Sequence, residues 1–162
     1  ESIRDSILQD TGQLDKTMFV KGTLDESMRR RSIYFTVKRS KLVPMLQVFD
    51  VPEPLVSQGQ RPTTTVAPQA LLLLNNPHLR KCCEDSAAQL IANNTEDHAM
   101  NDLFYQRSLS RNPNKSEVQK ASGFLASQTA SYKQSGVTDA KIQATADLIQ
   151  LMLCLNEFCY IY

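Results

Sequence analysis

Residues 28–76 read MRRRSIYFTVKRSKLVPMLQVFDVPEPLVSQGQRPTTTVAPQALLLLNN, and they carry the strongest structural signals of the chain. Ile33, Phe35 and Val37 alternate with more polar residues, a period of two that is typical of a half-buried strand. Further on, Pro68 suits the first turn of a helix, which the leucine run after it continues. This stretch therefore predicts a small β element followed by a short buried helix.

The apolar segment around Pro44 permits two interpretations. A proline there allows an edge strand or a short helical turn, but it excludes a central strand because its nitrogen has no hydrogen to donate. The sequence VPEP at residues 51–54 then imposes an extended turn. The predicted β element is accordingly limited to one or two short strands near residues 32–49.

The rest of the chain shows helical periodicity bounded by helix starts and stops. Asn76 followed by Pro77 starts one helix, and Asn114 with Glu117 forms the pattern of a capping box that starts another. Helices are predicted from the start of the chain to Gly12, from Asn76 to Asn93, from Asp97 to Asn112, from Asn114 to Gly136 and from Asp139 to about Tyr160.

The last predicted helix, capped by Thr138, is apolar nearly all round its second half, so we expect it to be the central buried helix. The predicted fold is therefore mainly α, a helical domain with a small β element. At 162 residues the chain has the size of one domain around one core. Residues 1–162 are accordingly predicted to form a single domain.

Bulk composition narrows the classes of function. The 18 Lys and Arg residues nearly balance the 17 Asp and Glu residues, so no global field favours nucleic acid or a membrane surface, and partners must be argued from local patches. The longest apolar runs are far shorter than the roughly 20 residues of a membrane span. The five glycines are isolated and the cysteine spacing matches no zinc site, so neither a cofactor nor a metal is predicted.

Cys82, Cys83, Cys154 and Cys159 lie on segments predicted to be helical. One interpretation is four buried free thiols, because cysteine in a helix often behaves as a small core hydrophobe. The other is a disulfide between the helix of Cys82 or Cys83 and the C-terminal helix, if two Cα atoms come within roughly 7 Å of each other.

The cationic side chains between residues 29 and 61 form the candidate binding site. Guanidinium groups suit planar sulfate and carboxylate groups because they make two parallel contacts. The alternative is structural: these side chains flank the strand, and some pair with Asp50 and Glu53 to hold the irregular loop against the core. The candidate ligand-binding residues for a sulfated or carboxylated glycan are Arg30, Arg31, Lys38, Arg39 and Arg61.

The sequence names no catalytic residue. His78 and His98 are the only imidazoles, and neither belongs to an H-E-x-x-H motif or follows G-x-S-x-G. Asp50 and Glu53 could form a carboxylate pair, but the Val and Pro between them indicate a turn. The catalytic residues of any reaction are therefore unknown.

Four ordered blocks resemble one known family. They are RRRSIYFTVKRSKLVPMLQVFDVPEP at residues 29–54, TTTVAPQALLLLNNP at 63–77, LSRNPNKSE at 109–117 and LIQLMLCLNEFCYIY at 148–162. Together they are similar to the planctomycete-specific family of unknown function called PSD1 (DUF1553). The resemblance covers nearly the whole chain but begins partway into the family domain. It implies that the chain is the C-terminal part of that domain, with an N-terminal portion missing.

The resemblance implies a setting but no catalytic residue. Members are usually the C-terminal part of large exported proteins that carry a second uncharacterised domain and often a c-type cytochrome-like domain. This implies a periplasmic or otherwise exported location, with the neighbouring domains as partners. The haem attachment pattern C-x-x-C-H is absent from this chain, so any redox role would belong to another domain.

Two hypotheses for function follow. In the first, the chain is a noncatalytic structural or binding module that presents the basic residues to an anionic glycan or a neighbouring domain. In the second, it is part of a polysaccharide-acting enzyme, which a cleft shared by Asp50, Arg31 and Arg61 would favour. Arginine side chains engaged by internal carboxylates and carbonyls would favour the structural interpretation.

Overall fold

The computed structural model describes residues 1–93 and 97–160. Over these residues the chain is mainly α-helical, as predicted, with eight α-helices and one short 3-10 helix. No helix among them is long and apolar enough to cross a bilayer. The elements are α1 (Ser2–Asp10), η1 (Ser32–Tyr34), α2 (Pro44–Val48), α3 (Ala67–Asn75), α4 (Pro77–Ala92), α5 (Asp97–Leu109), α6 (Lys115–Gln134), α7 (Ala140–Leu153) and α8 (Asn156–Cys159).

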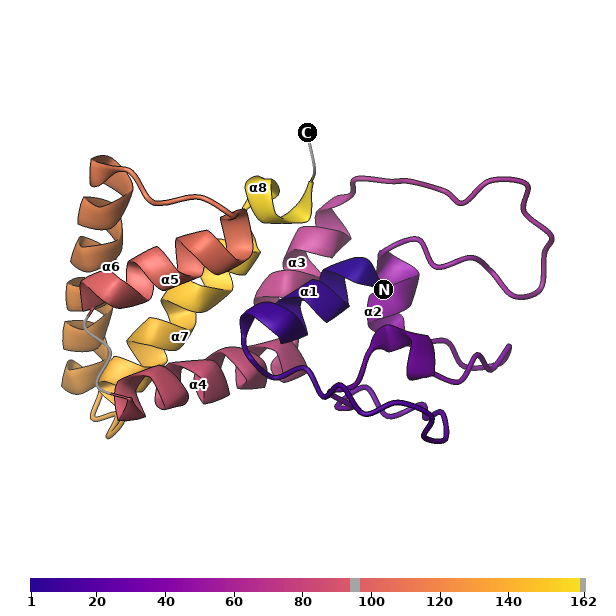
Figure 1. Cartoon of the computed structure of the whole chain (residues 1–162), viewed down its shortest axis with the longest axis horizontal. Helices are drawn as coiled ribbons and strands as arrows, with labels where there is room; N and C mark the ends of the chain where they lie inside the picture. The colour runs from indigo at the N-terminus through magenta and orange to yellow at the C-terminus, as the bar shows by residue number, and fades with distance from the viewer. Residues whose placement is uncertain (94–96, 161–162) are drawn as a thin grey trace.

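Helix α7 is the centre of the helical part of the molecule. It packs most extensively against α4 and α6, and α5 contacts both α6 and α7. Figure 1 shows α4–α7 grouped in one half of the molecule, while α2 and the long irregular segments extend from the other half. Residues 11–66, here called the irregular layer, are thus attached to one side of a helical bundle.

Burial confirms that the last long helix is central. Nine residues of α7 are buried. The main core joins α7 to α1, α3, α4 and α5, and a smaller cluster joins it to α6. A third cluster lies inside the irregular layer and consists of Met28, Phe35, Val43 and Leu46. The irregular layer therefore has a small apolar core of its own.

Local hydrogen bonds fix several helix ends where the sequence predicts them. Oδ1 of Asn76 accepts from two backbone N–H groups in the first turn of α4, at 2.9 and 3.0 Å. Asn114 and Glu117 complete the predicted capping box, with bonds of 2.9 and 2.7 Å between each side chain and the other residue's N–H. Gly136 follows α6 with φ +73°, a left-handed conformation that suits glycine.

The C-terminal segment differs from its prediction in two details. The helix expected from Asp139 to Tyr160 is divided into α7 and α8, because Leu155 has an extended backbone (φ −67°, ψ 142°). The Leu155 carbonyl accepts from two N–H groups of α8, so this residue starts a new helix. Thr138 is not the cap: Asp139 occupies the N-cap position of α7, without a side-chain hydrogen bond.

The predicted small β element is wrong, because the described residues form no sheet. Ser32–Tyr34 is a 3-10 turn, and Phe35 makes an isolated bridge with Thr23. Ile33 and Val37 are 74% and 71% exposed, whereas Phe35 is buried, so these alternate residues share no buried face. A strand needs a partner over several residues, and a single bridge supplies one pair. The segment at Pro44 takes the helical alternative and forms α2.

The cysteines confirm the free-thiol interpretation. All four are free, and the alternative disulfide is not formed. Cys82 and Cys83 are buried, whereas Cys154 and Cys159 are half-buried. Burial raises the pKa of Cys83 to about 12, which keeps this sulfur in the unreactive thiol form at neutral pH.

Candidate functional site

The candidate site is organised by a buried arginine on α1. The guanidinium of Arg4 donates to the carbonyl oxygen of Arg30 at 3.0 Å, to Oγ of Ser32 at 3.2 Å and to the carbonyl oxygen of Met28. Its Cζ lies 4.7 Å from the centre of the Phe35 ring. Burial lowers the pKa of Arg4, and the surrounding oxygens satisfy the buried cation. Arg4 therefore holds this part of the irregular layer against α1 from the inside.

The next residue, Asp5, holds the same segment through its carboxylate. Oδ1 of Asp5 accepts from the backbone N–H of Ser32 at 2.8 Å and from its hydroxyl at 2.7 Å. Oδ2 lies 3.7 Å from Nε of Arg31, whose side chain is still largely exposed. The Asp5 carboxylate thus orients the Arg31 side chain, most of which remains exposed to solvent.

Arg29 and Arg30 bind different parts of the molecule although they are adjacent. Arg29 donates to Oδ2 of Asp85 on α4 at 2.5 Å, which ties the irregular layer to the helical bundle. Arg30 donates to the carbonyl oxygen of Lys21 at 2.9 Å, and its Cζ lies 5.0 Å from the centre of the Tyr34 ring. Both guanidinium groups therefore have structural contacts.

Arg61 belongs to a separate set of internal contacts, in the loop between α2 and α3. Its Nε donates to the carbonyl oxygen of Asp50 at 2.9 Å, and Nη2 donates to Oε2 of Glu1 at 2.8 Å. The Asp50 carboxylate in turn accepts from the N–H of Thr64 at 2.7 Å and from its hydroxyl at 2.9 Å. These contacts fasten the loop to the end of α2.

A cavity of about 530 Å³ lies beside this network. Its wall includes Asp50, Arg61 and residues 63–65, together with side chains from α3 and α8. Arg31 is not part of that wall and lines a separate hollow beside α1. The described residues therefore do not form the cleft shared by Asp50, Arg31 and Arg61 that the enzyme hypothesis anticipates.

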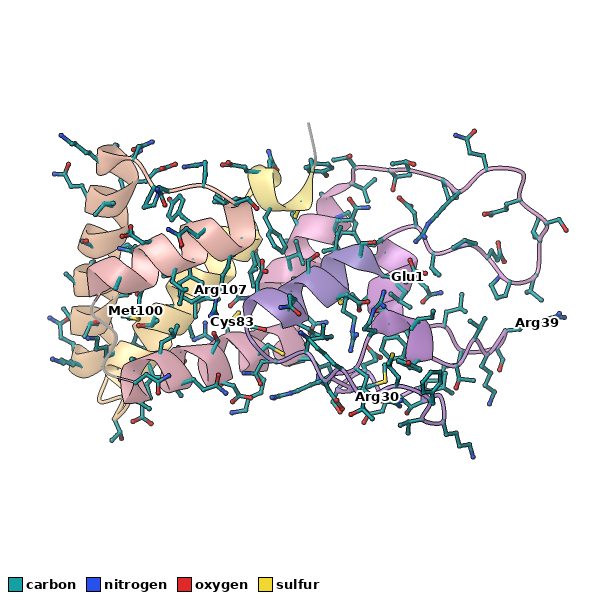
Figure 2. The ribbon with its side chains drawn as sticks, in the orientation of Figure 1. Glu1, Arg30, Arg39, Cys83, Met100 and Arg107 are labelled. Carbon is teal, nitrogen blue, oxygen red and sulfur yellow. The ribbon has the colours of Figure 1, made fainter. Side chains whose placement is uncertain are left out.

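Lys38, Arg39 and Lys41 form the exposed end of a tight turn, here called the basic tip. The N–H of Lys41 donates to the carbonyl oxygen of Lys38 at 3.0 Å and closes the turn. No carboxylate in the described part of the chain pairs with these three side chains. Figure 2 shows Arg39 at the far end of its loop, well separated from Arg30.

The predicted ligand-binding residues are thus distributed over three places. Arg30 and Arg31 lie at the base of the irregular layer, Lys38 and Arg39 lie in the basic tip, and Arg61 borders the cavity. Their role in binding a ligand stays a prediction. Of these five residues, Lys38 and Arg39 are exposed and have no ion pair to a described residue.

A comparison with models of protein families shows the family to which the chain belongs. The model described as PSD1, protein of unknown function (DUF1553), matches residues 1–125 of the 162-residue chain. The chain belongs to the PSD1 family. The region matched to PSD1 contains all of the candidate binding residues and ends inside α6. Neither a curated protein nor a solved structure matches this PSD1 chain.

Asp50 and His78, two of the residues considered as catalytic, lie in different parts of the PSD1 chain: Asp50 follows α2, and His78 is in α4. Asp50 is engaged by Thr64, and His78 is an exposed residue in the first turn of α4. The side chain of His98 lies outside the described residues. Across residues 1–93 and 97–160, no group of three or more His, Cys, Asp or Glu residues is placed to hold a metal ion.

Arg4 and Asp5 are the organising residues that the sequence interpretation missed. Ile7 and Leu8 predict the buried face of α1, and both are buried. Arg4 precedes Leu8 by four residues, a spacing that places two side chains on the same helix face. That spacing was the available signal, because a cation on a buried face must find internal oxygen partners.

Proposed function

We propose that this PSD1 chain is a noncatalytic binding module whose basic tip contacts an anionic polysaccharide. The observation that supports this is that the other three candidate arginines have internal contacts, whereas the side chains of the basic tip face solvent. Arg30, Arg31 and Arg61 each contact an internal carbonyl, a carboxylate or an aromatic ring, whereas no such contact is found for the side chains of the basic tip among the described residues. Sulfate or carboxylate groups on a polysaccharide would satisfy its three positive charges.

The proposed setting is a large exported protein, periplasmic or otherwise outside the cytoplasm. We base it on the resemblance to PSD1 members of planctomycetes, whose proteins usually carry a second uncharacterised domain and often a c-type cytochrome-like domain; three of the four blocks lie within the matched residues 1–125. In this arrangement the arginine contacts keep the module rigid. The basic tip is then free to hold the protein on a polymer while a neighbouring domain supplies any chemistry.

The alternative, a part of a polysaccharide-acting enzyme, has less support. Asp50 and Arg61 do border one cavity, but Arg31 lies elsewhere. The Asp50 carboxylate accepts hydrogen bonds from the N–H and the hydroxyl of Thr64, so it is already engaged in holding the loop. A fixed structural role explains these contacts more simply.

The test is retention of the protein on sulfated, carboxylated and neutral glycans at low and moderate salt. We expect retention on the charged glycans that salt weakens. Replacing Lys38, Arg39 and Lys41 by glutamine should abolish it. The matched control replaces Lys115, Lys120 and Lys133 of α6, three exposed residues, so the same charge is removed from the opposite half of the molecule.

Three results would count against the proposal. Equal loss of retention in both triple variants would mean that net charge alone acts. No retention of any glycan by a protein that circular dichroism shows to be folded would remove the glycan and leave an acidic neighbouring domain as the partner. Loss of retention after Arg30→Gln and Arg31→Gln, without any fall in thermal stability, would place the site at the base of the layer instead.

A further inference from the structure

The loop between Asp15 and Lys21 presents three consecutive apolar side chains to solvent. Met18 is 62% exposed, Phe19 94% and Val20 48%. We call these three residues the apolar tip. Exposed apolar residues are common singly, but three large ones in succession at a loop end form a concentrated patch. The apolar tip has no role in the proposed glycan contact.

Both ends of this loop are clamped by the arginines of the irregular layer. The N–H of Asp15 donates to the carbonyl oxygen of Arg29 at 2.9 Å, and Arg30 donates to the carbonyl oxygen of Lys21 at 2.9 Å. Oδ1 of Asp15 also accepts from the N–H and hydroxyl of Thr17, at 2.9 and 2.6 Å. The loop is therefore held out from the body at its base.

The backbone conformation of Phe19 supports a functional role for its exposed ring. Its φ is +62°, in the left-handed region that asparagine or glycine adopts more easily than an aromatic residue. Such strain persists where surrounding contacts enforce it, and it is concentrated at functional sites. Here the strained residue lies between the two clamped ends of the loop, and its aromatic ring is exposed to solvent. Nothing in the packing of the described residues requires a ring at that position.

A lysine lies near each end of the apolar tip in the sequence. Lys16 and Lys21 flank it, and both are exposed without an ion pair to any described residue. The basic tip extends from the same half of the molecule, opposite α6 (Figure 1). An apolar end bordered by lysines matches the interface of an anionic bilayer, where aliphatic and aromatic groups enter the acyl boundary and ammonium groups stay among the phosphates.

We propose that the apolar tip inserts into the interfacial region of a bilayer containing anionic lipids, so that the chain binds a membrane surface without spanning it. A bilayer fits better than a socket on another protein. Met18, Phe19 and Val20 are all exposed although they are consecutive, so apolar surface surrounds the tip and does not form one face. Acyl chains can cover such a tip from all sides. This proposal does not depend on the glycan contact.

The absence of tryptophan from the chain allows a direct test. In the Phe19→Trp variant the new indole reports on the tip alone. Vesicles of equal parts phosphatidylcholine and phosphatidylglycerol should shift its emission to shorter wavelength and protect it from acrylamide, whereas pure phosphatidylcholine should have a weaker effect. The control is Leu55→Trp, because Leu55 is also strongly exposed but lies on a different loop. Its emission should stay unchanged.

A second variant separates insertion from folding. Phe19→Asn removes the ring but keeps a residue that tolerates positive φ. We expect about a tenfold or greater loss of vesicle binding, because burial of an aromatic side chain is lost, with no loss of thermal stability. Lys16→Gln with Lys21→Gln should weaken binding to the anionic vesicles and reduce its salt dependence.

Several outcomes would overturn the proposal. One is an indole signal in folded Phe19→Trp that neither kind of vesicle changes. Another is unchanged vesicle binding in Phe19→Asn, which would place the contact elsewhere. A third is self-association of the chain that Phe19→Asn abolishes while vesicles have no effect, which would make a second copy the occupant of the tip.

Discussion

Arg80 on α4 donates a 2.6 Å hydrogen bond from Nη1 to Oδ1 of Asp147 on α7. The same guanidinium contacts Gln143 at 2.5 Å and Glu84 at 3.1 Å, and the hydroxyl of Tyr132 on α6 donates to the other Asp147 oxygen at 3.0 Å. Burial alone would lower the pKa of Arg80, but its carboxylate partners raise it overall. One ion pair therefore links three helices of the bundle.

Removing the cation should destabilise the bundle. Arg80→Met keeps most of the apolar stem but leaves the half-buried Asp147 carboxylate without its main partner. We expect a loss of about 2 kcal/mol in the free energy of unfolding, measured by urea denaturation. Lys81→Met is the matched control, because this neighbouring lysine pairs with Asp85 at the surface, and it should change stability by less than about 1 kcal/mol. Equal losses of stability in the two variants would contradict the role assigned to the Arg80–Asp147 ion pair.

Acid should weaken the contact between α6 and α8. Arg111 bonds both oxygens of Glu117 and of Glu157 at 2.7 to 2.9 Å. Hydrogen bonds from Arg111, then from the Asn114 N–H, lower the pKa of Glu117 to about 2, from an ordinary value of 4.5. The unfolded chain therefore binds this proton first, and the stabilisation present above pH 4.5 is lost as the pH falls toward 2. Thermal unfolding between neutral pH and about pH 3 should show this loss, and Arg111→Gln should flatten it.

Asp10 should have the opposite pH dependence. Burial at the end of α1 raises its pKa from 3.8 to about 6, and nearby Arg107 offsets only part of this effect. The folded state therefore holds the proton more tightly, and stability falls as the pH rises from about 4 to 6. Asp10→Asn should raise the melting temperature at pH 7 and leave it unchanged near pH 3.5, about where wild-type Asp10 is protonated. The control Gln9→Asn, at the neighbouring exposed position, removes no titratable group and should change the melting temperature equally at both pH values.

Two glycines should respond to alanine in opposite directions. A Cβ on Gly22 would lie 2.8 Å from Oγ1 of Thr36 and 3.2 Å from the carbonyl oxygen of Tyr34, so Gly22→Ala should cost about 1 kcal/mol. Gly123 lies within α6 with nothing within 4 Å of its added Cβ. Gly123→Ala should therefore stabilise the protein by about 0.5 to 1 kcal/mol. Melting curves of the two variants would test both predictions. A rise in melting temperature for Gly22→Ala as well would contradict the packing described for Gly22.

The helices could be predicted because their ends are local. Asn76 caps α4 through its own side chain, and Asn114 with Glu117 caps α6 within one turn. The prediction of a β element failed because alternating apolar residues at Ile33 and Val37 do not show whether a neighbouring segment can pair with them. The break at Leu155 also had no local cause that the sequence could reveal, since neither glycine nor proline occurs there.

The candidate site was less accessible to sequence reasoning. The concentration of cations was visible, but their partners lie far along the chain: Arg29 meets Asp85 and Arg61 meets Glu1. Such contacts depend on the whole fold. The clamp that holds out Phe19 was hidden for the same reason, because it needs the main chain of residues 15 and 21 beside Arg29 and Arg30.

The placement of α7 also determines which residues must be present for the protein to fold. The residues matched to the PSD1 model end at 125, within α6, yet Ala140–Leu153 fills the space between α4 and α6. A shortened protein ending at residue 125 would leave the apolar sides of Leu79, Ala87 and Leu125 open to water, and we expect it to aggregate. The matched region and the folding unit therefore have different boundaries.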